Sequence, residues 1–176
     1  MIIQSVRGVA AGLSLLVCAG VQAGNNPACD DAAFAEKFAA AYRTDYKAIS
    51  AKMEGDELGH AQQVEAFTAA LIKGGAWSSP EAAAQYLANA RNVDADAVEL
   101  AAAKKKHERD ILLQLTVLDS FEFIASANKE VAARARCNLA DGLIAHARLL
   151  ADATGRASAL LETKLRQVAK EKKIPL

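Results

Sequence analysis

The sequence "VAARARCNLADGLIAHARLLADA", residues 131–153, decides which fold class the chain can adopt. Its apolar side chains recur every three or four positions, at Val131, Ala135, Leu139, Leu143, Ala147 and Leu150. This spacing places them on one face of an α-helix, and that face has to pack against other helices. No stretch of the sequence shows the two-residue alternation that is typical of a half-buried strand. The sequence therefore predicts an all-α fold.

Start and stop signals divide the rest of the chain into further helices. Asp30 or Asp31 can cap the first, Ser78 or Ser79 before Pro80 is a strong start signal, and Asp94 can cap another. Gly74-Gly75 ends a helix, and we interpret Gly55 and Thr154-Gly155 as two further breaks. The expected helices cover about residues 31–53, 56–73, 80–92, 94–125, 129–153 and 157–170. We therefore expect a bundle of about five to six helices, framed by the helices at 31–53, 94–125 and 129–153.

The N-terminal residues 1–23 have the pattern of a signal peptide. Arg7 precedes an apolar run, and Val21-Gln22-Ala23 offers a cleavage site before Gly24. The run is too short for a comfortable membrane span, and a lipid anchor on Cys18 is a weaker alternative. We expect a periplasmic or secreted protein whose mature chain, residues 24–176, forms a single domain without a membrane span.

Removal of the signal peptide takes away Cys18 and leaves two cysteines, Cys29 and Cys137. Disulfides form and persist in the oxidising environment outside the cytoplasm. We therefore expect one disulfide between Cys29 and Cys137 that staples the bundle. Two buried thiols and a crosslink between chains are the alternatives. The sequence has no C-x-x-C pair, so it lacks the redox, haem-attachment and zinc-knuckle motifs that need one.

Charge is unevenly distributed along the mature chain. Residues 24–100 carry 12 acidic and 6 basic side chains, whereas residues 101–176 carry 9 and 14. We interpret this asymmetry as two halves that attract each other during folding. Nucleic acid is not an expected partner, because no aromatic residues alternate with the basic ones and no recognition motif is present.

The sequence "KKKHERD", residues 104–110, interrupts the apolar pattern for almost two helical turns. A turn without apolar residues forces a charged side chain toward the bundle, and we expect it to be Lys105, Lys106 or Arg109. The simpler interpretation is a helix that projects beyond the bundle, with solvent on all sides. The functional interpretation is a binding edge for an anionic partner, formed by Lys105, His107 and Arg109.

Other candidate residues are weaker. Glu57 and His60 have the E-x-x-H spacing of di-iron bundles, but such sites need a second copy of this motif, which the sequence lacks. His146, Arg148 and Asp152 lie on one side of their helix, where a solvated face is the usual explanation. Trp77 and Tyr86 are expected to pack at the rim. The sequence predicts no catalytic residue, no metal site and no cofactor, since it has no nucleophile motif and no glycine-rich phosphate loop.

We therefore expect an exported helical protein that binds another protein, in the manner of a small inhibitor or immunity protein. The alternative is a small periplasmic enzyme, or a carrier of an anionic small ligand, with Arg and Lys inside the bundle. In its general plan, as an exported all-α chain with a disulfide, the sequence resembles the secreted chorismate mutases. Their first-helix pattern is missing here, so the resemblance implies a bundle and no catalytic residue.

Overall fold

The computed structural model describes residues 26–124 and 128–176. Within these ranges the chain is helical, which confirms the all-α class. The elements are the short 3-10 helix η1 (Pro27–Asp30) and the α-helices α1 (Ala32–Lys73), α2 (Pro80–Asn92), α3 (Ala95–Ile124) and α4 (Lys129–Lys172). The predicted signal peptide and its cleavage site lie outside the described residues.

The prediction of five to six helices was wrong, because two expected breaks do not occur. α1 continues through Gly55, and α4 continues through Thr154-Gly155. A glycine inside a helix costs only about 1 kcal/mol relative to alanine, and packing against a neighbouring helix readily outweighs that cost. Ion pairs four residues apart also span each site, Lys52 with Asp56 and Arg156 with Asp152.

The predicted stop at Gly74-Gly75 is confirmed, and its geometry shows why these glycines end a helix. Gly75 has a φ of 77°, which side chains rarely adopt. The N–H of Ala76 then donates to the carbonyl oxygen of Leu71 at 2.9 Å. At Gly74 a side chain would collide with Ile174, because the C-terminal tail returns across this turn.

The predicted start signals are also confirmed. Asp31 caps α1 by accepting hydrogen bonds from the N–H groups of Ala33 and Phe34. Ser79 caps α2, in which Pro80 is the first residue. Asp94 accepts from the N–H of Ala97 at the start of α3.

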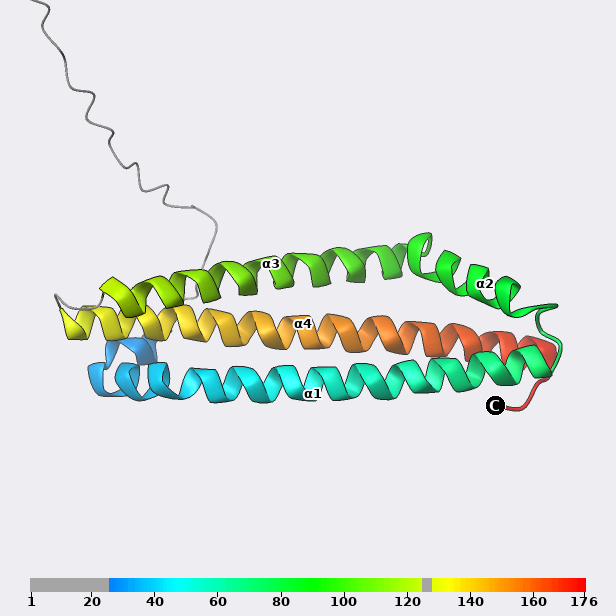
Figure 1. Ribbon diagram of the computed structural model, residues 1–176, viewed down its shortest axis with the longest axis horizontal. Coiled ribbons are helices and arrows are strands. Elements are labelled where there is room, and N and C mark those ends of the chain that lie inside the picture. The colour runs from blue at the N-terminus through cyan, green and yellow to red at the C-terminus, as the bar shows by residue number, and fades with distance from the viewer. Residues whose placement is uncertain (1–25, 125–127) are drawn as a thin grey trace, which may run out of the picture.

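Helix α4 lies between α1 and the α2–α3 pair along the length of the molecule (Figure 1). At about 1.5 Å per residue, its 44 residues span about 66 Å. The fold is therefore a long rod in which one central helix contacts every other element. None of the described helices combines the length and apolar character that a membrane crossing requires.

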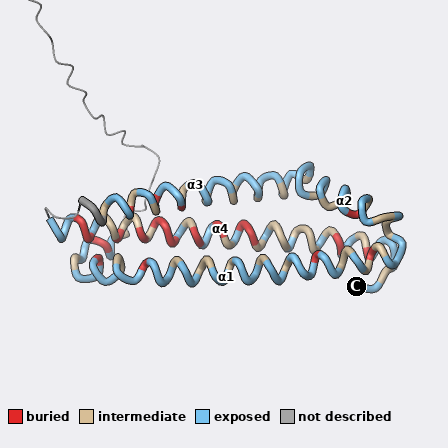
Figure 2. The backbone as a smooth tube through the Cα atoms, viewed as in Figure 1, coloured by how far each residue is buried: buried red, intermediate tan, exposed pale blue. Residues whose placement is uncertain are grey.

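Burial follows this arrangement, since most buried residues belong to α4 (Figure 2). Among the described residues, the apolar core has three clusters along the rod. The middle cluster joins Tyr42, Ile111, Leu118 and Leu143 of three different helices. The cluster near the α1–α2 turn includes Leu71 and Leu165, with Trp77 and Tyr86 packed against it.

The third cluster surrounds the disulfide, which the structure confirms. Cys29 of η1 and Cys137 of α4 are bonded, with a Cα–Cα distance of 5.7 Å, and both side chains are fully buried. Ala35 and Ala133 pack beside them. The bond therefore ties the start of α1 to the first third of α4.

Candidate functional site

The charged run at residues 104–110 lies within α3, beside α4, and does not extend beyond the bundle (Figure 1). Lys104 reaches across to α1, where its Nζ lies 3.0 Å from Oε1 of Glu57. His107 is hydrogen-bonded to His146 of α4. The interpretation of this run as a projecting, fully solvated overhang is therefore wrong, because one of its faces packs on the neighbouring helices.

The residues on that packed face differ from those that we expected. Lys104, His107 and Asp110 are half-buried, whereas Lys105 and Arg109 are exposed. Residues three apart share a helix face, so an inward His107 brings Lys104 and Asp110 inward with it. The expected binding edge is accordingly divided. Lys105 and Arg109 lie together on the exposed side, and His107 faces α4.

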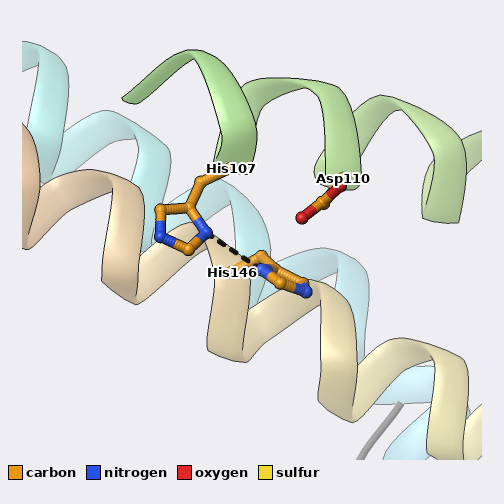
Figure 3. A group of neighbouring side chains, drawn as sticks. All are labelled: His107, Asp110 and His146. Atoms are coloured by element: carbon orange, nitrogen blue, oxygen red, sulfur yellow. Dashed lines mark hydrogen bonds between the residues drawn. The ribbon is translucent and has the colours of Figure 1, made fainter. Parts of the chain in front are cut away.

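His107, Asp110 and His146 form a compact polar cluster between α3 and α4 (Figure 3). The two Nδ1 atoms of the histidines lie 3.1 Å apart, so one ring donates a hydrogen bond to the other. One nitrogen from each histidine and one carboxylate oxygen of Asp110 all lie within 4.8 Å of one another. All three residues are partly shielded from solvent.

The surroundings favour a neutral imidazole at His107. Burial lowers the pKa of His107 below its ordinary value, electrostatic interactions with His146 and Lys106 lower it further, and Asp110 raises it. Arg109 approaches Asp110, with 3.4 Å between Nη2 and Oδ1. A neutral histidine keeps one nitrogen lone pair available as a hydrogen-bond acceptor or a metal ligand.

Gln114 lies one helical turn beyond Asp110 and is almost completely buried, at 1% exposure. Its amide nitrogen and oxygen form no hydrogen bond with any residue that the structure describes. The amide packs over Gly142 of α4, where an added Cβ would lie 3.1 Å from the amide nitrogen. Gly142 is itself one turn before His146. A buried amide without a partner is costly, so it indicates a site with a function or a missing partner.

An open groove lies between α1, α2 and α4, about 640 Å³ in volume. We call it the α1–α2 groove. Val64, Ile72, Leu87 and Leu161 give it mostly apolar walls, and Glu65 and Arg91 lie on opposite helices. The other lining residues are Glu57, His60, Ala61, Thr68, Ala69 and Ser158. The volume is in the range of ligand sites, and the apolar walls suit an apolar surface of a ligand or partner.

The E-x-x-H pair lies at this groove, but its two side chains have separate partners. Glu57 pairs with Lys104, and Nδ1 of His60 is hydrogen-bonded to Glu162 of α4. The pair therefore contributes polar contacts between helices. Sequence spacing alone could not reveal these partners, which come from helices α3 and α4.

The remaining candidates do not form one site. Asp152 pairs with Arg156, whereas His146 faces His107. Trp77 and Tyr86 pack against each other at 5.2 Å between ring centroids, next to the cluster that contains Leu71. This arrangement agrees with the rim packing that was expected of them.

No protein-family model, no curated protein and no solved structure matches this chain. The interpretation of its function therefore depends on the groove and the polar cluster themselves. Sequence analysis missed the α1–α2 groove, because its walls come from three helices. It placed His107 in a possible binding edge, but it did not predict the hydrogen bond between His107 and His146.

Proposed function

We propose that the chain is an exported, non-catalytic binding protein that receives an amphipathic helix of a partner protein in the α1–α2 groove. The observation that carries the proposal is the groove itself, with apolar walls and a volume of about 640 Å³. Its long walls are helices, and helix-in-groove recognition uses apolar side chains spaced along such a surface. Amphipathic helices are a common form of ligand for grooves of this kind.

Charge favours a partner helix with basic residues beside its apolar stripe. The α1 wall carries the exposed Glu65, and residues 24–100, which include α1, have twice as many acidic as basic residues. The exposed Leu58, at 61% exposure, adds apolar surface on the same helix. Complementary charge of this kind increases association rates more than it increases affinity.

The alternative, a carrier of an anionic ligand, would need cations directed into the cavity. Arg91 lines the groove from α2, but its side chain is exposed. Lys104 lines a smaller neighbouring cavity and is already paired with Glu57. These contacts favour an apolar partner over an anionic small ligand.

The proposal is tested by filling the groove without disturbing the core. Ala69 lines the groove and is exposed, so Ala69→Arg should obstruct it while the helix stays folded. Ala51→Arg is the matched control, since it places the same side chain on an exposed position of α1 outside the groove.

A photoreactive amino acid at Ala61, another exposed groove residue, would first crosslink the partner in cells for identification by mass spectrometry. Binding of the purified partner should then weaken at least about tenfold in Ala69→Arg, which corresponds to about 1.4 kcal/mol, and remain unchanged in Ala51→Arg. Equal binding by both variants, or the absence of any crosslinked protein, would contradict the proposal.

Export is a second part of the proposal, and it has its own test. N-terminal sequencing of protein from the periplasmic fraction should give a chain that starts at Gly24. A chain that starts at Met1, or one with a lipid on Cys18, would contradict cleavage before Gly24.

A further inference from the structure

A second site lies away from the α1–α2 groove, at the polar cluster between α3 and α4. His107 and Asp110 are three residues apart on α3, so both face α4, where His146 meets them (Figure 3). Two imidazoles and one carboxylate from two helices converge within 4.8 Å. Each of these side chains turns inward from its own helix, so all three are partly shielded from solvent.

We infer that His107, Asp110 and His146 bind a divalent first-row transition metal ion such as Zn²⁺. Neutral imidazole nitrogens and carboxylate oxygens are ordinary ligands of Zn²⁺, at about 2.0–2.2 Å. Two nitrogens at this distance from a tetrahedral ion are separated by about 3.3–3.4 Å. The observed Nδ1–Nδ1 separation of 3.1 Å is close to that value. Rotation of the Asp110 side chain would bring its carboxylate to the ion as the third protein ligand.

Three protein ligands leave a fourth position of a tetrahedral ion open to water. Gln114 lies one helical turn beyond Asp110 on α3, so it is a candidate for an outer-shell group of this site. Its buried amide has both a donor and an acceptor, neither of which is bonded within the described part of the chain. Groups in the outer shell of a metal site typically donate to or accept from its ligands or bound water. Gly142 leaves room for this amide one turn from His146.

The test uses the mature protein after removal of metal with a chelator, titrated with ZnCl₂ in a calorimeter. The chain has three histidines, and the third, His60, lies on α1 and is hydrogen-bonded to Glu162. His60→Ala is therefore a matched control for His146→Ala. Wild type and His60→Ala should each bind one Zn²⁺ per chain.

His146→Ala should lose far more affinity than the roughly 10–100-fold that removal of an outer-shell partner costs. Gln114→Leu should lose an amount within that range, because it removes a positioning residue and no ligand. Co²⁺ in place of Zn²⁺ should give visible absorption from nitrogen and oxygen coordination in wild type and in His60→Ala, and none in His146→Ala.

Because His146→Ala also removes a packed side chain, a loss of binding in this variant has two explanations, and Asp110→Asn provides an independent test. This change keeps the size of the side chain and the histidine pair, and it should still weaken Zn²⁺ binding. Added Zn²⁺ should also raise the Tm of wild type and leave that of Asp110→Asn almost unchanged. The inference is overturned if wild type does not bind Zn²⁺, or if all the variants bind it as wild type does. The two histidines would then be a simple hydrogen-bonded pair.

Discussion

Removal of the disulfide should destabilise the protein by an amount that follows from the length of chain it closes. Cys29 and Cys137 are separated by 108 positions. In the chain-entropy model, a crosslink over a loop of this length removes about 16 cal/mol/K from the denatured state. At 25 °C the double variant Cys29→Ala/Cys137→Ala should therefore lose about 4.8 kcal/mol of unfolding free energy. Because domains are stable by only about 5–15 kcal/mol, this loss is large.

Urea unfolding followed by circular dichroism measures the effect. With a slope of about 2 kcal/mol per molar urea, the midpoint should fall by about 2.4 M. Dithiothreitol is the matched control, since it should reproduce most of the loss in wild type and have no effect on the double variant. The cysteines pack beside Ala35 and Ala133, with Phe38 against the same cluster.

A loss below about 1 kcal/mol would refute this reasoning. It would mean that the denatured chain already holds the start of α1 near α4 without the bond, so the crosslink removes little freedom. An unchanged midpoint in dithiothreitol, together with a large loss in the double variant, would instead show that the bond resists reduction in its buried position.

Three further changes have distinct expected outcomes. Gln114→Leu should stabilise the metal-free protein by about 1–3 kcal/mol in urea unfolding, because it removes a buried amide without a partner; destabilisation would show that the amide is bonded in solution. Lys105→Glu with Arg109→Glu should cost less than about 1 kcal/mol, since both side chains are exposed; if these residues contact an acidic partner, the same double change should slow its association most at low salt. The hydrogen bond from Lys164 lowers the pKa of Asp94, so the contribution of Asp94 is present above about pH 4 and is lost at lower pH. Urea unfolding should therefore show wild type more stable than Asp94→Asn at pH 7, with a difference that shrinks toward pH 3; a constant difference would contradict this assignment.

The fold class, the helix starts and the disulfide could be predicted because their causes are local or compositional. Asp31 and Ser79 cap helices through their own neighbours, and the two cysteines that follow residues 1–23 have one simple pairing. The length of the helices could not be predicted in this way. Gly55 and Gly155 look like breaks in the sequence, but packing on the neighbouring helix decides whether a glycine interrupts a long helix.

The candidate sites depend on the alignment of helices that are far apart in sequence. The charged run at residues 104–110 showed that the apolar pattern is interrupted around His107. The position of α3 along α4 decides that His107 meets His146 and that Gln114 lies over Gly142, and no periodicity within α3 contains this information. The α1–α2 groove likewise depends on where α2 lies relative to α1 and α4.

The position of the disulfide has a consequence for local unfolding. Among the described residues the covalent link between helices lies at one end of the rod, whereas α2 lies toward the other end and packs on each neighbour over a short stretch. Local opening should therefore begin near α2 and proceed toward Cys137. Amide hydrogen exchange would then be fastest in α2 and slowest around residues 137–150 of α4. A protease should first cut at the α2–α3 junction, where Val93 is 76% exposed.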